Sequence, residues 1–115
     1  MADCIFCRIV AGEIPATIVG RTEDAVAFRD LNPQAPTHVL VIPVKHVSSM
    51  TDADSDEAEV AVGRAIRLAA QVATQLGLDA DGYRLVINTG RDGGQSVWHV
   101  HLHLLGGRPM GWPPG

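Results

Sequence analysis

The segment WHVHLH, residues 98–103, constrains the fold most strongly, because three of the five histidines stand on every second residue. Side chains alternate between the two faces of a β-strand, so this spacing predicts a strand with His99, His101 and His103 on one face. The apolar residues between them then supply the opposite, core-facing side. Each imidazole carries a donor and an acceptor that need partners. Three neighbouring imidazoles therefore indicate a chemical surface rather than core packing.

The remaining pattern predicts an α+β fold with five mostly antiparallel strands, one long helix and a short N-terminal helix. Alternating apolar residues between turn signals mark the strands. Besides the histidine segment, the strands are expected at 17–21, 25–30, 38–44 and 83–88.

Two helices are expected from their start and stop signals. A short one covers the segment IFCRIVAGEIP and ends near Gly12 and Pro15. The long one begins with a capping-box pattern at Asp54 and Glu57 and ends at Gly77. Its predicted buried face carries Val62, Ile66, Ala69, Ala73 and Leu76.

Length and composition predict one domain spanning residues 1–115, with 46% hydrophobic and 19% charged residues. The net charge is −4 and Lys45 is the single lysine, so a nucleic-acid backbone is not an expected partner. The longest apolar run, residues 39–44, is too short to cross a membrane. Residues 1–10 lack the apolar region of a signal peptide. We therefore expect a cytoplasmic protein in which Cys4 and Cys7 stay reduced.

The segment TGRDGGQS, residues 89–96, directly precedes the histidines. Glycine-rich backbone can direct several N–H groups at one anion, and a serine adds a hydroxyl. Two interpretations remain open, a phosphate site and a metal site built on the alternating histidines. The absence of a neighbouring Asp or Glu on the histidine face favours phosphate. The loop residues in question are Gly90, Gly93, Gly94, Gln95 and Ser96.

Three segments of the sequence together resemble one known family. They are HVHLHLL at 99–105, GGQSVWHVHLHLLGGRPMGWPPG at 93–115 and LNPQAPTHVLVIPVKH at 31–46. They resemble the histidine triad (HIT) family, and within it the Hint branch of nucleotide-binding proteins, bacterial type with a CxxC. The resemblance implies a HIT-like fold. It also implies an enzyme that hydrolyses the P–N bond of nucleoside 5′-phosphoramidates through a nucleotidyl-histidine, releasing a nucleoside monophosphate and an amine.

The resemblance also assigns roles to individual positions. His101 would be the nucleophile and His38 a supporting histidine. His103, Ser96 and Asn88 would donate to the phosphate, with His103 or Ser96 protonating the leaving amine. Asp30 would bind the ribose hydroxyls, and it also fits an Asx turn. Further implied substrate contacts are backbone N–H groups near Val97, the loop residues Gly94 and Gln95, and Trp112 in the tail. The implied base pocket, whose residues composition alone would assign to the core, consists of Ile5, Phe6, Ile9, Phe28 and Leu31.

Cys4 and Cys7 form a CxxC, which is typical of a redox pair or of two metal-binding thiolates. A redox motif follows a strand, whereas only three residues precede Cys4. The resemblance adds His46 and His99, and the resulting Cys₂His₂ set suits a closed, structural zinc site. A metal-free thiol pair remains the alternative. No catalytic metal is required by the expected chemistry.

The family resemblance further implies a homodimer whose C-terminal tail, residues 106–115, lies near the partner's active site, and a purine nucleotide as ligand. Gly111 stands where many relatives carry a larger residue, and Trp98 stands where tyrosine is more familiar. Three other functions remain open: a non-catalytic nucleotide-binding scaffold, a dinucleoside polyphosphate hydrolase, which the tail disfavours, and a metalloenzyme.

Overall fold

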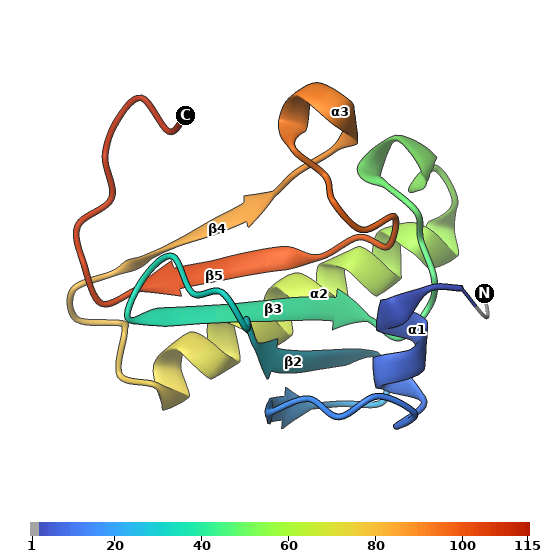
Figure 1. The fold of residues 1–115 in the computed structure, drawn as a ribbon, viewed down its shortest axis with the longest axis horizontal. Helices are drawn as coiled ribbons and strands as arrows, with labels where there is room; N and C mark the ends of the chain where they lie inside the picture. The colour runs from blue at the N-terminus through green and yellow to red at the C-terminus, as the bar shows by residue number, and fades with distance from the viewer. Residues whose placement is uncertain (1–2) are drawn as a thin grey trace.

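The computed structural model describes residues 3–115, and its strands form one sheet in the order β1-β2-β3-β5-β4. All four neighbouring pairs are antiparallel, so the predicted α+β fold is confirmed (Figure 1). In chain order the elements are α1 (Ile5–Val10), β1 (Ile18–Arg21), β2 (Ala25–Arg29), β3 (Thr37–Pro43), the 3₁₀ turn η1 (Met50–Asp52), α2 (Asp56–Gln75), β4 (Tyr83–Ile87), α3 (Gly90–Gly93) and β5 (Leu102–Gly106).

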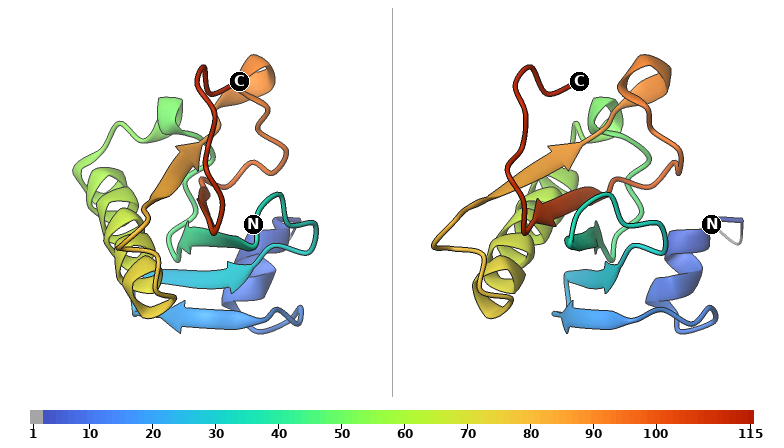
Figure 2. Two further views of the ribbon diagram at one scale, coloured as in Figure 1. Left: turned by 90° about the vertical axis from the view of Figure 1, so that its left-hand side faces the viewer. Right: turned by 60° about the vertical axis from the view of Figure 1, so that its left-hand side comes forward.

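The two main helices lie on opposite faces of the sheet (Figure 2). Helix α2 crosses one face, where Leu68 and Val72 pack against Val39, Leu102 and Leu104. Helix α1 covers one end of the other face through Phe6 and Ile9, which join a separate apolar cluster. Because α1 covers only one end of the second face, the rest of that face is where a site can form.

Helix α2 follows its predicted pattern with two corrections. Ser55, not Asp54, is the N-cap, since its hydroxyl accepts from the N–H of Ala58 at 3.1 Å. Ile66 is 40% exposed, because the buried face of the helix runs through Ala65, Leu68 and Ala69, and Ile66 lies outside it. The buried residues of α2 are Ala58, Ala61, Val62, Ala65, Leu68, Ala69, Val72 and Ala73.

The predicted ends of the helices are confirmed at two glycines. Gly77 has a φ of +75° directly after the last turn of α2, and the Leu78 N–H bonds back to the Ala73 carbonyl at 2.9 Å. Gly12 has a φ of +77° just after α1. In the described residues 3–115, none of the helices combines the length and the apolar character needed to cross a bilayer.

The predicted histidine strand is only partly correct, because β5 starts at Leu102 and residues 97–99 form bends. Strand β4 ends at Ile87, which pairs with Leu102, and β3 continues through Ile42 and Pro43 without pairing to the segment before Leu102. One backbone bond, from Val100 N–H to the Val47 carbonyl at 2.7 Å, anchors this irregular part. The preceding glycine-rich segment was expected as a loop and contains the single-turn helix α3.

Candidate active site and metal centre

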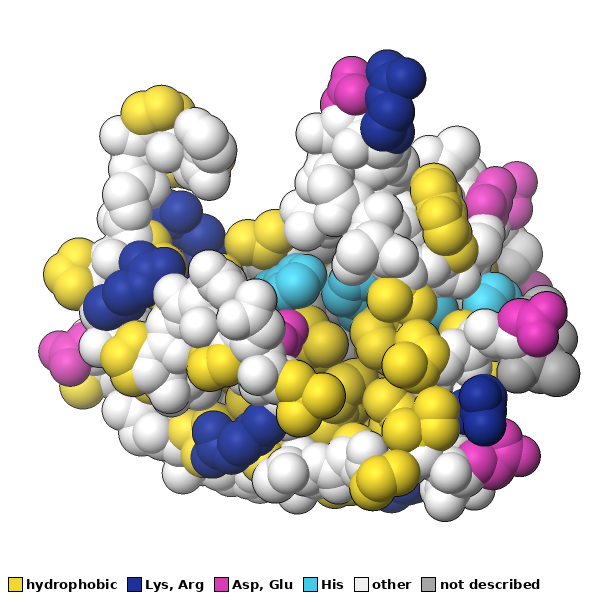
Figure 3. All heavy atoms as spheres, viewed as in Figure 1, with side chains coloured by type: hydrophobic (Ala, Val, Ile, Leu, Met, Phe, Trp, Pro, Cys, Tyr) yellow, Lys and Arg dark blue, Asp and Glu magenta, His cyan; other side chains and the backbone are white. Residues whose placement is uncertain are grey.

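The three histidines of residues 99–103 lie on the face of the sheet opposite α2, as their alternation predicts. Val100, Leu102 and Leu104 are buried toward α2, at 1% exposure or less. His99 and His101 are also buried, at 0% and 4% exposure. Figure 3 shows histidine atoms in a row across this face, above a hydrophobic area. The histidine row is therefore the floor of a site rather than an open surface.

His101 is oriented by the backbone next to it. Its Nδ1 lies 2.8 Å from the carbonyl oxygen of His99, and a carbonyl can only accept. The Nδ1 atom therefore carries the hydrogen, and Nε2 keeps a free lone pair. The ring of Phe6 packs edge-on against His101 with a centroid distance of 5.1 Å. A bond from the backbone thus fixes the tautomer that a nucleophilic imidazole needs.

His103 is oriented through a second histidine. The N–H of Gln34 donates to His38 Nδ1 at 3.0 Å, so His38 must carry its hydrogen on Nε2. That Nε2 lies 2.9 Å from His103 Nδ1, which accepts, and the remaining hydrogen of neutral His103 is therefore on Nε2. In residues 3–115 this His103 Nε2 is buried and has no hydrogen-bond partner. The His103 Nε2–H group is therefore a buried donor that can bind an acceptor atom of a ligand.

The pKa values of this pair keep both rings neutral. Burial, together with the neighbouring His101 and His38, lowers the pKa of His103 to about 4 against the raising effect of Asp30. Burial also lowers the pKa of His38, against the raising effect of the Asp30 carboxylate, which lies 3.5 Å from His38 Nε2. A neutral His103 can donate a hydrogen bond from Nε2 but is a poor acid.

Asp30 makes the predicted Asx turn and also contacts the histidine row. Its Oδ1 accepts from the Asn32 N–H at 2.7 Å, which makes the predicted Asx turn. Its Oδ2 faces His38 at the edge of the histidine row. The carboxylate is therefore held beside the site and can accept further hydrogen bonds.

The glycine-rich segment is shaped by Gln95, which is 8% exposed. The Gln95 side-chain amide donates to the carbonyls of Ser48 at 2.7 Å and Val97 at 3.1 Å, and its oxygen accepts from the Gly90 N–H. Its side chain is occupied by these contacts, so its role is to hold the loop. Gly94 has a φ of +84°, which turns the chain toward the exposed Ser96.

The expected base-pocket residues separate into two groups. Phe6, Ile9 and Phe28 are buried together in one cluster, and the rings of Phe6 and Phe28 meet edge-on at 5.7 Å. Ile5 is 47% exposed at the start of α1, while Leu31 is 99% exposed. Three of these residues therefore form a wall next to His101, and the other two lie on the surface.

The remaining predicted site residues lie at the rim. Asn88 directly follows β4, and Val97 lies in the bends before the histidines; both are half-buried. Ser96, Val97 and Trp98 line an open hollow of about 510 Å³. Trp112 is 83% exposed in the tail.

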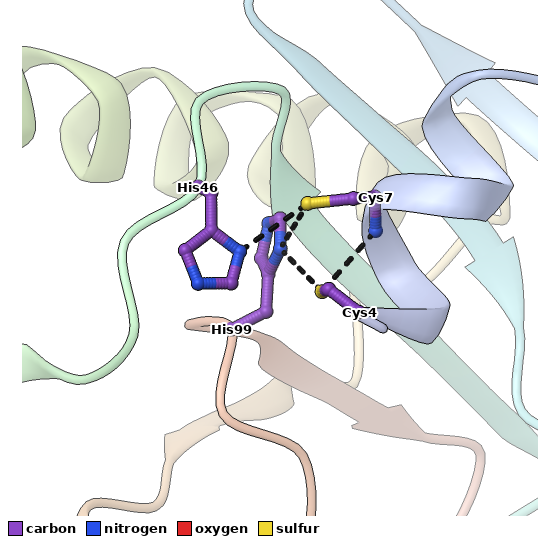
Figure 4. A group of neighbouring side chains, drawn as sticks. All are labelled: Cys4, Cys7, His46 and His99. Atoms are coloured by element: carbon purple, nitrogen blue, oxygen red, sulfur yellow. Dashed lines mark hydrogen bonds between the residues drawn. The ribbon is translucent and has the colours of Figure 1, made fainter. Parts of the chain in front are cut away.

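Four residues from distant parts of the chain form a second cluster (Figure 4). They are Cys4, Cys7, His46 and His99, and their ligand atoms all lie within 4.8 Å of one another. Cys4 is the N-cap of α1, and its sulfur accepts from the Cys7 N–H at 3.3 Å. The first turn of α1 thus turns both thiols of the CxxC toward the two histidines.

The geometry of this cluster fits a tetrahedral zinc ion. Cys4 Sγ lies 3.3 Å from His99 Nδ1, and Cys7 Sγ lies 3.2 Å from His46 Nδ1 and 3.6 Å from His99 Nδ1. Zinc bonds of about 2.3 Å to sulfur and 2.0–2.1 Å to nitrogen place such ligands roughly 3.5 Å apart. The described residues therefore already stand at ligand spacing.

The protonation of His99 also fits a metal ligand. Its Nε2 lies 2.8 Å from the Pro43 carbonyl and so carries the hydrogen, which leaves Nδ1 free for a metal. Burial lowers the pKa of His99 to about 4, so the ring is neutral. Burial, together with Cys4, raises the pKa of Cys7 to about 11. A thiolate at Cys7 therefore needs a cation beside it.

A third group, Asp30, His38 and His103, also has its ligand atoms within 4.8 Å of one another. Its hydrogen bonds argue against a metal there. Because Gln34 donates to His38 Nδ1, the hydrogen of His38 occupies Nε2, the atom that faces the other two residues. This effect of Gln34 on the His38 tautomer could not be found in the sequence, since Gln34 acts through its backbone N–H.

Comparisons with known proteins agree with both clusters. The chain is 51% identical to the purine nucleoside phosphoramidase of Escherichia coli K12 over 109 residues, which cover 95% of this chain and 91% of that protein. It is 52% identical to the 14 kDa zinc-binding protein of Zea mays, with 96% and 87% covered. The donor set of Cys4, Cys7, His46 and His99 thus fits the structural zinc that the sequence predicts.

The fold agrees as well. A HIT family hydrolase from Legionella pneumophila has a crystal structure that matches with a TM-score of 0.93 at 50% identity, covering 98% of this chain and 100% of that one. The HIT domain family model matches residues 11–110, which include the complete histidine row. The resemblance found in the sequence is confirmed. The chain belongs to the HIT domain family.

Proposed function

We propose that the protein hydrolyses nucleoside 5′-phosphoramidates to a nucleoside monophosphate and an amine. One observation carries the proposal: His101 and His103 lie next to each other, with a ring-centroid distance of 5.1 Å, in opposite tautomers. His101 offers a lone pair on Nε2, and His103 offers a buried hydrogen on Nε2. A nucleophile beside a donor suits attack on a phosphorus atom whose oxygens need hydrogen bonds. The activity of the E. coli relative supports the choice of substrate.

In the first step, His101 Nε2 attacks phosphorus, and the P–N bond to the amine breaks. The Nδ1–H bond to the His99 carbonyl stabilises the positive charge that develops on the ring. His103 Nε2–H, the Asn88 amide and the N–H groups near Val97 donate to the phosphate oxygens. The step leaves a nucleotidyl-His101 intermediate.

The same geometry indicates which group protonates the leaving amine. Neutral His103 is a hydrogen-bond donor, so the exposed Ser96 hydroxyl is the better group to pass a proton from solvent to the leaving amine. In the second step, water attacks phosphorus, the bond to His101 breaks, and water releases the proton that balances the first. Nucleoside monophosphate leaves, and His101 returns to its starting tautomer.

The nucleoside would lie between helix α1 and Asp30. The carboxylate of Asp30 can accept from the 2′ and 3′ hydroxyls of ribose while it keeps its Asx turn. Phe6, Ile9 and Phe28 offer an apolar wall for a purine next to His101. This arrangement supports a purine nucleotide as ligand.

Cys4, Cys7, His46 and His99 would hold a zinc ion that cross-links α1 to the segments after β3 and before β5. All four positions are taken by protein ligands, so the ion would supply no reaction chemistry. His99 takes part in both clusters: its side chain belongs to the metal cluster, and its backbone carbonyl orients His101.

We also propose a homodimer formed through the edge strand β4. Leu85, Val86 and Ile87 are apolar and only half-buried on this strand, whereas the opposite edge strand β1 carries a register shift. Arg84 on β4 donates to the Gly111 carbonyl at 2.8 Å, which keeps the tail with Trp112 beside this edge. A second copy paired here would bring the tail close to the partner's site. Sedimentation equilibrium should give twice the chain mass, and a monomer at micromolar concentration would contradict the dimer.

The two free cysteines of the described residues support a reducing, cytoplasmic location.

The activity is tested with adenosine 5′-phosphoramidate. The wild type should release adenosine monophosphate, and His101→Ala should lower kcat by at least about 1000-fold, as removal of a nucleophile does. Zinc content and melting temperature serve as the control that His101→Ala is folded. Full turnover by the variant would contradict the mechanism.

The alternative functions make different predictions in the same assay. A nucleotide-binding scaffold would bind adenosine monophosphate without turning over any phosphoramidate. A dinucleoside polyphosphate hydrolase would cleave diadenosine substrates faster than phosphoramidates. A metalloenzyme would lose kcat on chelation while its melting temperature stays unchanged.

A further inference from the structure

Near its start, the C-terminal tail carries an arginine, Arg108, that contacts the loop between β2 and β3. Arg108 donates to the Gln34 carbonyl from Nε at 3.2 Å and from Nη2 at 2.9 Å. Gln34 belongs to the loop between β2 and β3. This loop and the start of the tail lie at the same end of the sheet, because Thr37 pairs with Gly106 (Figure 1). Two donors from one guanidinium hold a carbonyl in a defined direction.

Two glycines make this contact possible. A side chain on Gly106 would place its Cβ 2.7 Å from a Leu78 methyl group, and one on Gly107 would place it 2.8 Å from Pro36. Gly107 also has a φ of +90°, which other residues rarely adopt. The GGR sequence therefore lets the chain turn tightly against the loop and delivers the guanidinium to Gln34.

Gln34 is also the residue that sets the tautomer of His38. Its N–H donates to His38 Nδ1 at 3.0 Å, and His38 Nε2 then donates to His103 Nδ1 at 2.9 Å. Hydrogen bonds on both sides of Gln34, joined through its own backbone, thus link the exposed Arg108 to His38 and from there to His103. Arg108 holds Gln34 from the carbonyl side, and His38 meets it on the N–H side.

We propose that Arg108 is a positioning residue for the phosphate donor His103, acting through Gln34 and His38. The proposal rests on the proposed function, in which His103 Nε2–H binds a phosphate oxygen. Without Arg108, the Gln34 N–H is held less firmly, and His38 can place its hydrogen on Nδ1. His103 Nδ1 then loses its donor. A share of His103 carries its hydrogen on Nδ1 and presents a lone pair to the phosphate, which repels it.

The direct test is the tautomer of each ring, read by long-range ¹⁵N–¹H correlation NMR on the zinc-loaded protein. In the wild type, both His38 and His103 should carry their hydrogen on Nε2. Arg108→Ala should give a mixture of tautomers at both rings. It should also lower kcat by about threefold to tenfold, a change typical of one weakened hydrogen-bond network, with KM changed less than about twofold.

Two further variants keep the test specific. Arg108→Lys keeps one donor and should restore part of both the tautomer population and kcat. Arg21→Ala is the matched control, because Arg21 Nη2 also donates to a backbone carbonyl, that of Val10, at 2.7 Å. It should leave the tautomers and kcat as in the wild type.

The outcomes separate this inference from the proposed function. Unchanged tautomers in Arg108→Ala, with an active wild type, overturn the role of Arg108 alone. The same mixture in Arg21→Ala would also overturn it, because the effect would then be general loosening. An inactive wild type with normal tautomers would instead refute the proposed function.

Discussion

The two histidine clusters use the same side chain for opposite purposes. In the metal cluster, the Pro43 carbonyl takes the hydrogen of His99 Nε2 and leaves Nδ1 as a ligand. In the phosphate cluster, which consists of His38, His101 and His103, the His99 carbonyl accepts the hydrogen bond from His101 Nδ1 and leaves Nε2 as a nucleophile. His103 completes the contrast, since its Nδ1 accepts and its Nε2 donates. The hydrogen-bond partner of each ring therefore decides which nitrogen carries the hydrogen, and with it the chemistry of that histidine.

The clusters are also different in what they hold together. The metal cluster joins α1 to two irregular segments, one after β3 and one before β5. The phosphate cluster lies on β3 and around β5, in the middle of the sheet. We therefore expect changes in the first to lower stability and changes in the second to lower turnover.

After His101→Ala, the largest effect is expected for His103→Ala, because it removes the buried donor aimed at the phosphate. Loss of one such donor lowers kcat by about 10²–10³-fold. Zinc content should stay at the wild-type value. Single-turnover kinetics with adenosine 5′-phosphoramidate measures the effect, and a kcat within threefold of the wild type would remove His103 from the mechanism.

Cys7→Ser should have the reverse effect on the other cluster. Loss of a thiolate ligand should release zinc, and a few kcal/mol of lost stability lowers the melting temperature of a domain this size by roughly 10 °C or more. The kcat should fall by less than about tenfold, since the reacting groups remain. Calorimetry together with zinc analysis checks this. A large loss of kcat at an unchanged melting temperature would mean that the metal takes part in the reaction.

The pH dependence of stability should differ between the wild type and His103→Gln. The pKa of folded His103 is about 4, whereas an unfolded histidine titrates near 6.5, so between these values the unfolded state binds more protons. Stability from this group is complete above pH 6.5 and is lost as the pH falls toward 4. Melting temperatures in excess zinc should fall less steeply over this window in the variant. Equal slopes would show that burial of His103 does not lower its pKa.

The smallest effect is expected for Ser55→Ala, which changes the fold but neither cluster. Loss of the N-cap bond to Ala58 should destabilise the protein by about 1 kcal/mol. Both zinc content and kcat should be unchanged, and chemical denaturation measures the difference. Any loss of activity here would mean that activity follows general stability, and the contrast between the clusters would fail.

The sequence predicted the sheet well because its signals are local, whereas of the metal cluster the residues alone indicated Cys4 and Cys7, and the family resemblance added His46 and His99. Alternation placed the three histidines opposite Val100, Leu102 and Leu104 even though the strand itself starts late. The late start could not be predicted, since it depends on where β4 ends and on where the pairing with β3 stops. Likewise, the buried stripe of α2 follows small alanines that carry little signal alone, so Ile66 was placed wrongly.

The tautomers could not be predicted from the sequence. Each depends on a backbone group of a residue with no catalytic character, such as Pro43 or Gln34. For Gln95, which was predicted to bind substrate, the sequence did not indicate that its side chain bonds to three backbone groups. Backbone contacts between distant segments follow from the packed fold alone.

The central claim is that His101, free of metal, attacks phosphorus. Rapid quenching of the wild type with adenosine 5′-phosphoramidate, followed by peptide mass analysis, should find the adenylyl group on His101 and on no other histidine. Cys7→Ser should form the same adduct, while His101→Ala should form none. An adduct on another residue, or an adduct that persists in His101→Ala, would contradict the account.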